Sequence, residues 1–409
     1  MQISSLNLLR PSFIRLISTA ALPKTFSRPV TIPNDAYLLS SMVEELANSE
    51  RLNDAIVLMF EATKKFEQPI VPWNILFTHV TKQKKLKLAI KLFNEMKVRG
   101  VKPNERTYTI LLSGCANSPA PTAPLKAEKL LEEMKRVAGN KAMGSARPFV
   151  PKLEEPDQTT QFIHGNPPVS EVKDPSTIHY NNLLKVYSRQ KKFIEMIKLY
   201  DSMCSRTKIP DHEYSPETCD SSIAPVKPDI ITYTIVANNL SLLKTDEGFR
   251  QALSIWQDLR DDVEAHPDAE QMLIFDDRFL QALVNGSLYC KDKELLLKGL
   301  ELIDEACDLK LGVKYPTTPS YLELPSLNKR EQTQVSRCLR ENPRPHILDL
   351  ALRSISILGF HHLASKVFFS LVKPNNPSDP SRIEPDIKHF ALVFASICDN
   401  SRAIFQQRK

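Results

Sequence analysis

The chain repeats one short pattern four times, and this self-similarity limits the possible folds more than any other feature. Each copy opens on an aromatic residue, at Trp73, Tyr108, Tyr180 and Tyr233. A second apolar block follows and ends on Met96, Met134, Met203 or Leu259. Within both blocks apolar residues recur with the i, i+3, i+4, i+7 spacing of an amphipathic helix. Each copy therefore predicts two helices joined by a polar turn.

Each copy also closes on a proline that is followed by a small polar or acidic residue. The closing pairs are Pro103-Asn104, Pro175-Ser176, Pro228-Asp229 and Pro385-Asp386. Proline suits this place because it ends one helix pair and is tolerated just before the next helix begins. A lone helix pair cannot bury both of its faces, so such pairs stack side by side. The pattern predicts an all-α solenoid.

The composition agrees with a helical, non-catalytic chain. Thirty prolines against ten glycines among 409 residues argue against glycine-rich nucleotide loops and large β-barrels. No apolar run approaches the roughly 18 residues that span a bilayer. The seven cysteines are scattered without a CxxC pair, which favours free thiols over disulfides or a zinc site. No nucleotide, protease or deaminase motif is present, so we expect no enzyme activity, no cofactor and no metal.

The aromatic opening, the Ala-x-x-Leu-Phe-x-x-Met second helix and the close Gly100–Asn104 resemble pentatricopeptide (PPR) repeats. The cleanest copy, Ile70–Asn104, is 35 residues long. A tetratricopeptide array would need a 34-residue period and a Leu-Gly…Tyr pattern in its first helix. The resemblance implies a right-handed superhelical solenoid of helix-turn-helix repeats over residues 34–409.

The predicted organisation contains strong repeats, weaker repeats and insertions. The best repeats are expected at 70–104, 105–176, 177–229 and 230–268, and the weaker ones at 34–69, 276–310 and 346–386. The stretches 137–174 and 204–226 are rich in Pro, Ser and Asp, so we predict that they are loops inserted after a second helix. A third irregular stretch is expected at 315–344, and a further first helix from Ile387.

The resemblance further implies single-stranded RNA binding, with two side chains of each repeat reading one base. They are the polar residue after the opening aromatic and the residue after the closing proline. The pairs are Asn74 with Asn104, Thr109 with Ser176, and Asn181 with Asp229; Thr234 has no clear partner, because Pro267-Asp268 lies out of register. By analogy with the family, the first pair favours a pyrimidine and the third a uracil. Such side chains can hydrogen-bond the base edges that single-stranded RNA exposes.

A competing interpretation exists for the closing residues. Asn, Ser or Asp after a helix-ending proline is a common N-cap, which accepts a hydrogen bond from a free backbone N–H of the next helix. That role explains Asn104, Ser176 and Asp229 without any RNA. It explains Asn74 and Asn181 less readily, because both are expected inside the first turn of a helix.

Charge is distributed unevenly along the chain. Residues 64–136 carry 15 Lys and Arg against six Asp and Glu, whereas residues 246–310 carry seven against 16. The first of these segments is therefore the one that could attract phosphates. Its densest run contains Lys82, Lys84, Lys85 and Lys87, which we interpret as phosphate contacts; a solvated helix face is the alternative.

The first 33 residues predict a mitochondrial targeting segment. They contain Arg10, Arg15, Lys24 and Arg28, no acidic residue, and apolar residues around the arginines. Import depends on such a positively charged, amphipathic N-terminus, and the two central arginines interrupt the apolar run that a secretory signal needs. An ordinary disordered tail is the alternative.

Together these features suggest a single-stranded-RNA-binding adaptor of the mitochondrial matrix with no catalysis of its own. The chain resembles the fungal PPR factors for small-subunit rRNA 5′-end processing and group I intron splicing. One alternative is a message-specific translational activator or mRNA stabiliser. Another is a helical-repeat scaffold or mitoribosome-associated subunit. The C-terminal half is a candidate surface for a small-subunit precursor or another protein partner.

Overall fold

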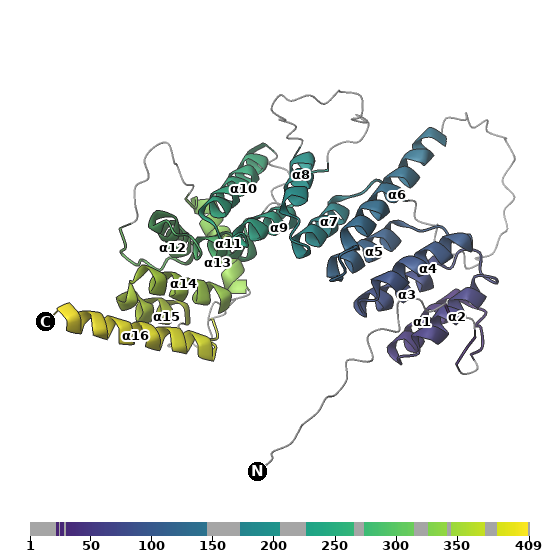
Figure 1. Ribbon diagram of the computed structural model, residues 1–409, viewed down its shortest axis with the longest axis horizontal. Coiled ribbons are helices and arrows are strands. Elements are labelled where there is room, and N and C mark those ends of the chain that lie inside the picture. Colours follow the sequence, from purple (N-terminus) through teal and green to yellow (C-terminus); the bar gives the residue numbers. More distant parts are fainter. Residues whose placement is uncertain are drawn as a thin grey trace, which may run out of the picture. The chain divides into compact units, whose positions relative to one another are not determined.

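The computed structural model consists of two compact units, residues 1–175 and residues 176–409, which are described separately (Figure 1). It describes residues 22–23, 25–27, 30–144, 172–204, 226–265, 274–314, 326–341, 345–372 and 383–407. Every regular element in these ranges is a helix, as the amphipathic spacing predicts. None of these helices is long and apolar enough to cross a membrane.

The first unit contains three consecutive helix pairs. They are α1 (Ala36–Asn48) with α2 (Leu52–Ala62), α3 (Ile70–Lys82) with α4 (Leu86–Val98), and α5 (Glu105–Asn117) with α6 (Ala123–Gly144). The first helices of the pairs, α1, α3 and α5, pack against one another in order, and each also contacts the second helix of its own pair. This arrangement buries both faces of α3, which a single pair cannot do.

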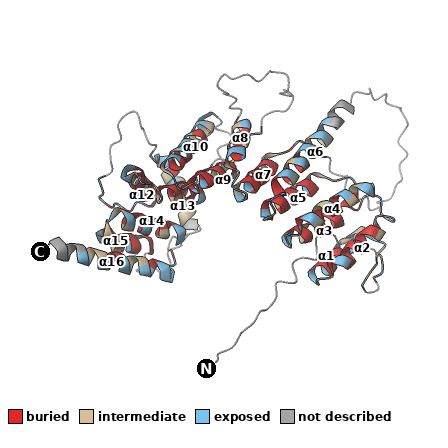
Figure 2. Ribbon diagram, viewed as in Figure 1, coloured by how far each residue is buried: buried red, intermediate tan, exposed pale blue. Residues whose placement is uncertain are grey.

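The repeated apolar residues of the sequence form the core of this unit. Trp73 and Tyr108, the aromatic openers, are almost completely buried. The Trp73 ring stacks on Phe77 with 5.7 Å between centroids, and the Tyr108 ring meets the edge of Phe93 at the same separation. Figure 2 shows the buried residues lying along the helix faces that are turned toward neighbouring helices. The aromatic openers are therefore packing residues.

The end of α4 explains the Gly-x-x-Pro-Asn close. Gly100 has φ +79°, and Val101 N donates to the Met96 carbonyl, so the helix ends in a left-handed turn that glycine adopts without a steric penalty. Pro103 then precedes Asn104, the N-cap of α5. The chain thus leaves one helix pair and enters the next across the six residues 99–104.

The second unit begins with three further pairs. They are α7 (Thr177–Arg189) with α8 (Phe193–Met203), α9 (Ile230–Ser241) with α10 (Asp246–Ala265), and α11 (Asp277–Ser287) with α12 (Lys293–Cys307). The first helices α7, α9 and α11 again pack in order. The aromatic openers Tyr180 and Tyr233 are buried here as well.

The pairing changes after α12. The helix α13 (Lys329–Glu341) stands alone before α14 (Pro345–Leu358), a short 3-10 turn η2 (His361–Leu363), α15 (Ala364–Val372) and α16 (Ile387–Gln407). In this part α14 packs on α12, α15 and α16, and less extensively on the preceding first helix α11. The irregularity follows from α13, which packs on α12.

A buried ion pair holds α13 in place. Glu331 accepts hydrogen bonds from Arg260 Nη2 at 2.6 Å and from Trp256 Nε1 at 2.9 Å, and both donors lie on α10. The Glu331 side chain is 8% exposed and that of Arg260 18%. Because the carboxylate is paired and also hydrogen-bonded, its burial does not leave an uncompensated charge.

Two predicted loops differ from the structure. The helix α6 continues to Gly144, into the stretch 137–174 that the sequence suggested is a loop, because residues 137–144 contain no proline and include good helix formers. The stretch 315–344 contains α13, whose alternation of charged and apolar residues is helical. The predicted insertion 204–226 falls almost entirely outside the described residues.

Candidate nucleic-acid interface

Asn74 and Asn104 are brought together by the packing of α3 against α5. Asn74 is the fifth residue of α3, and its Nδ2 donates to Asn104 Oδ1 at 3.2 Å. Thr107, the third residue of α5, donates its single hydroxyl hydrogen to Asn74 Oδ1 at 2.7 Å, and the same hydroxyl oxygen lies 2.9 Å from Asn104 Oδ1. Asn74 is only 5% exposed, whereas Asn104 is half-buried. One threonine hydroxyl therefore fixes both amides of the predicted pair.

The second unit contains the same network between α7 and α9. Asn181 Nδ2 donates to Asp229 Oδ1 at 2.9 Å. The Thr232 hydroxyl donates its single hydrogen to Asn181 Oδ1 at 2.7 Å, and the same hydroxyl oxygen lies 2.9 Å from Asp229 Oδ1. Asn181 is 4% exposed and Asp229 is half-buried. Two of the predicted pairs thus share one geometry, in which the helix residue is buried and the closing residue reaches the surface.

The closing residues also act as helix N-caps, as the competing interpretation expected. Asn104 Oδ1 accepts from Thr107 N at 3.0 Å, and Asp229 Oδ1 accepts from Thr232 N at 2.8 Å. In return the threonine hydroxyl accepts from the backbone N–H of each cap at 3.2 Å. Capping and pairing are therefore compatible, because the same oxygen serves the backbone and the neighbouring amide.

Thr107 and Thr232 are site residues that reasoning from the sequence missed. The signal is present in both places as an Asn or Asp followed three residues later by Thr, which is the spacing of a capping box. Ser176 begins the equivalent box with His179, whose Nδ1 accepts from Ser176 N at 3.1 Å. Thr109 belongs to the first unit and Ser176 to the second, and their pairing stays a prediction.

Thr109 and Thr234 use their hydroxyl hydrogens within their own helices. Thr109 Oγ1 donates to the Glu105 carbonyl at 3.0 Å, and Thr234 Oγ1 donates to the Ile230 carbonyl at 2.7 Å. Each oxygen can still accept a hydrogen bond. Residue Asp276 is the N-cap of α11, which packs on α9, so it stands where the closing partner of Thr234 belongs. Asp268, the residue weighed for that role, lies outside the described residues.

The four lysines of the basic run surround one turn. Lys82 is the last residue of α3, Lys84 and Lys85 form the turn, and Lys87 lies in the first turn of α4. All four are exposed. No ion pair joins any of them to an acidic residue in the part of the chain that the structure describes. Their charge is therefore directed to solvent.

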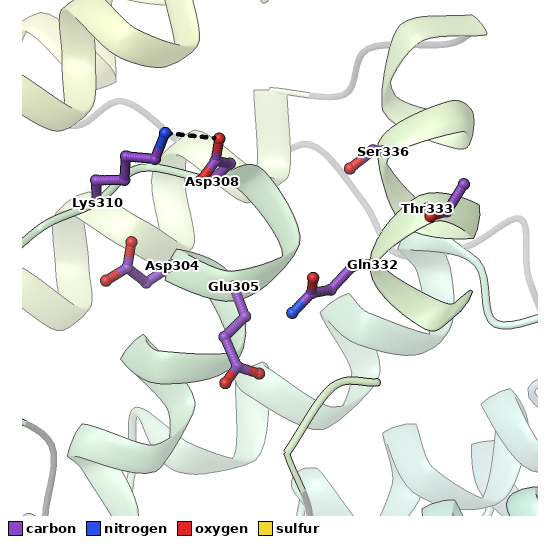
Figure 3. Close-up of a pocket in the computed structure, with 7 residues that line it drawn as sticks. All are labelled: Asp304, Glu305, Asp308, Lys310, Gln332, Thr333 and Ser336. Carbon is purple, nitrogen blue, oxygen red and sulfur yellow. Dashed lines mark ion pairs between the residues drawn. The ribbon is translucent and has the colours of Figure 1, made fainter. Parts of the chain in front are cut away.

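A pocket of about 520 Å³ lies between the end of α12 and α13 and has the opposite character (Figure 3). Asp304, Glu305 and Asp308 line it on the α12 side, and Lys310 offsets only Asp308, at 3.3 Å. Burial raises the pKa of Glu305. Among the described residues no group of His, Cys, Asp or Glu is arranged to hold a metal. An acidic pocket of this kind disfavours phosphate.

Cys115 is buried in the core. Burial raises the pKa of Cys115 to about 12, so this thiol stays protonated at neutral pH and packs as an apolar group. Cys290 lies between α11 and α12 and is half-buried.

Comparison with known proteins gives matches to two family models and to several individual proteins. The model described as the PPR repeat family matches residues 69–117, and the PPR repeat model matches residues 178–207. The mitochondrial pentatricopeptide repeat-containing protein 2 of Schizosaccharomyces pombe is 28% identical over 133 residues, which are 32% of this chain and 28% of that protein.

Similar solved structures include the pentatricopeptide repeat protein PPR10 in complex with an 18-nt psaJ RNA element. It is 16% identical with a TM-score of 0.36, over 91% of this chain and 49% of that one. PPR10 from maize is 14% identical with a TM-score of 0.34, over 91% and 48%. The chain thus spans about half the length of PPR10 and less than a third of the fission yeast protein.

Proposed function

We propose that the chain, which matches pentatricopeptide repeat models over residues 69–117 and 178–207, binds single-stranded RNA and reads bases with the side chains that join neighbouring first helices. The observation that carries this proposal is the matching network at Asn74, Asn104 and Thr107 and at Asn181, Asp229 and Thr232. The same three-residue geometry, built at two separate places in the chain, is more than either helix cap needs.

In this mechanism the buried residue positions the half-buried one. Thr107 fixes the oxygen of Asn74, so the Asn74 amide nitrogen is directed at Asn104 Oδ1. Asn104 is then held at the surface in one orientation, where its amide can meet the Watson–Crick edge of an unpaired base. By analogy with the family, the neutral Asn104 favours a pyrimidine and the acceptor Asp229 a uracil. Losing such a contact costs about 1–3 kcal/mol of discrimination.

The basic run of the first unit supplies the sequence-independent part of the binding. Lys82, Lys84, Lys85 and Lys87 are exposed, and their ammonium groups can neutralise RNA phosphates. Thr109, Ser176 and Thr234 complete the set of proposed base contacts. The acidic pocket beside α13 is not part of this interface.

We place this activity in the mitochondrial matrix, where the protein acts as an adaptor in small-subunit rRNA 5′-end processing or group I intron splicing. The acid-free segment 1–33, which lies outside the described residues apart from a few positions, and the mitochondrial name of the fission yeast protein support the compartment. The RNA-processing role rests on the family resemblance. A message-specific translational activator or mRNA stabiliser uses the same RNA-binding surface and differs only in its target.

A protein scaffold or mitoribosome-associated subunit is the second candidate, and α16 is the observation that favours it. Ile387, Phe390, Phe394 and Ile397 are exposed along one face of this helix, from 79% exposed at Ile387 to 44% at Phe390. An exposed apolar face of this kind is typical of a surface that binds a protein. The two activities are compatible, because α16 lies far along the chain from the paired asparagines.

Binding of the double variant Asn74→Ala, Asn181→Ala to a randomised RNA pool tests the proposal. Sequencing of the RNA that the wild-type protein selects should reveal a preferred base sequence. The variant should lose this sequence preference. Asn94→Ala, an exposed asparagine on the second helix α4, is the matched control and should keep the preference. A variant with the wild-type preference would favour the scaffold. Circular dichroism of all three proteins checks that they remain folded.

A further inference from the structure

The turns between the two helices of a pair contain residues in an unusual backbone conformation. Glu50, Lys84, Lys191 and Lys244 all have φ between +55° and +60°. The hydrogen bonds of two turns match: Lys84 N donates to Thr81 O and Lys85 N to Val80 O, and Lys191 N donates to Ser188 O and Lys192 N to Tyr187 O. Each of these residues therefore ends a first helix in the left-handed conformation, where glycine is favoured.

The turn alone does not account for lysine at three of these four places. A side chain in the left-handed conformation is strained, and the chain uses glycine for the same conformation at Gly100, Gly312 and Gly359. A cation near a helix C-terminus gains some energy from the helix dipole. Glu50 has the wrong charge for that gain and still occupies the equivalent turn, so the turn does not require a lysine.

The lysines keep a constant distance from the proposed base contacts. Lys84, Lys191 and Lys244 each follow the candidate base-reading residue of their own repeat, Asn74, Asn181 or Thr234, by ten residues. Along a helix this spacing corresponds to about 15 Å. Each of these repeats therefore presents a polar contact at the start of its first helix and an exposed positive charge beyond its end.

The repeat that begins at Glu105 departs from this pattern. Its turn between α5 and α6 contains Pro119 ten residues after Thr109, and none of its residues has a positive φ. That turn is longer than the turns that contain Lys84 and Lys191, and it has no lysine between Ser118 and Thr122. The pattern is thus a property of particular repeats and does not follow from helix pairing in general.

We propose that Lys84, Lys191 and Lys244 form a set of phosphate contacts, one per repeat, on the turns that follow the first helices. This inference rests on the proposed RNA binding and extends it to two lysines outside the basic run. The strained backbone fixes the point at which each side chain leaves the protein. At Lys244 the ammonium lies 4.4 Å from the centre of the Tyr289 ring, which holds the side chain without neutralising its charge.

The test is the triple variant Lys84→Gly, Lys191→Gly, Lys244→Gly, compared with Glu50→Gly and with a triple Lys→Arg variant. The probe is a fluorescently labelled oligouridine, titrated at several salt concentrations. Glycine relieves the backbone strain, so both glycine variants should melt at a higher temperature than the wild type. Only the triple glycine variant should bind RNA more weakly, and the arginine variant should bind like the wild type.

The expected size follows from counterion release. Each phosphate contact contributes about 0.7 to the slope of log affinity against log salt for single strands, so the triple glycine variant should lose about 2 from that slope and bind about 100-fold more weakly at 0.1 M salt. An unchanged slope in a stabilised triple variant would overturn the inference and leave RNA binding intact. Failure of the wild type to bind any RNA would instead refute the proposed function. A lower melting temperature in the glycine variants would refute the strain argument.

Discussion

Replacing Thr107 with valine removes one hydroxyl from the centre of the Asn74–Asn104 network and leaves a side chain of nearly the same shape. In the wild type that hydroxyl donates to Asn74 Oδ1 at 2.7 Å and accepts from Asn104 N at 3.2 Å. Asn74 is 5% exposed, so water does not readily replace the lost donor. A buried polar atom left without a partner costs about 1–3 kcal/mol. With the lost capping contact, we expect Thr107→Val to destabilise the α3–α5 contact by about 2–3 kcal/mol.

Hydrogen–deuterium exchange read by mass spectrometry measures the loss of stability at the α3–α5 contact. A loss of 2–3 kcal/mol corresponds to about 30- to 150-fold faster exchange of the protected amides in α3 and α5, if these exchange through opening of that contact. Thr109→Val is the matched control, because its hydroxyl donates to a carbonyl of its own helix, at 3.0 Å, and its loss should change exchange less than threefold. Equal exchange in the two variants would mean that the Thr107 hydroxyl does not hold the pair together.

Three other perturbations test the packing. A Cβ at Gly299 would lie 2.0 Å from Ser287 Oγ, so Gly299→Ala should lower the free energy of unfolding, measured in urea, by about 1–3 kcal/mol. A Cβ at Gly139 meets nothing within 4 Å, so the control Gly139→Ala should raise that free energy by about 0.5–1 kcal/mol. A change of the same sign in both variants would contradict the close packing of α11 on α12. Glu331→Gln breaks the buried ion pair with Arg260 and should lower the free energy of unfolding by about 3 kcal/mol. We expect α13 to detach, which would appear as faster amide exchange in residues 329–341; unchanged protection of these amides would show that the ion pair does not anchor the helix. Burial raises the pKa of Cys115 to about 12, so little of its reactive thiolate is present at pH 8. Iodoacetamide at pH 8 should therefore modify the exposed Cys398 and spare Cys115 in the folded protein, whereas rapid labelling of Cys115 would show that α5 opens readily.

The helix pairs could be predicted from the sequence because their apolar residues recur regularly at helical spacing and their ends carry distinct residues. Helices begin at Ile70, Glu105, Thr177 and Ile230, where the sequence pattern opens each repeat. The closing proline and the N-cap explain this, since both act through the local backbone. Local chemistry of this kind can be read without knowing the neighbours of a helix.

The hydrogen-bond network around the paired asparagines could be predicted from the sequence only in part. The sequence suggested that Asn74 belongs with Asn104, and that Asn104 caps a helix, as separate interpretations. The two roles coincide in one oxygen because Thr107 comes into contact with α3 only when α5 packs on it. A contact that depends on tertiary packing leaves no periodic signal, although the capping-box spacing marks the residues that make it.

The departures from the predicted organisation have the same origin. The helix α13 carries few apolar residues, and its place is determined by Glu331, which reaches Arg260 and Trp256 on α10. Asp276 was missed as a cap because Pro267-Asp268 offered a better match to the closing pattern. In both cases a distant contact or an irregular loop outweighs the local repeat.

RNA binding by the paired asparagines is the central claim, and ultraviolet crosslinking in living cells followed by sequencing of the attached RNA tests it most directly. We predict one sharp footprint for the wild-type protein, at an rRNA precursor end or an intron, and its loss in the Asn74→Ala, Asn181→Ala variant at equal protein level. A footprint in a message leader would identify the target as an mRNA instead. Crosslinking no higher than in an untagged control would contradict the claim.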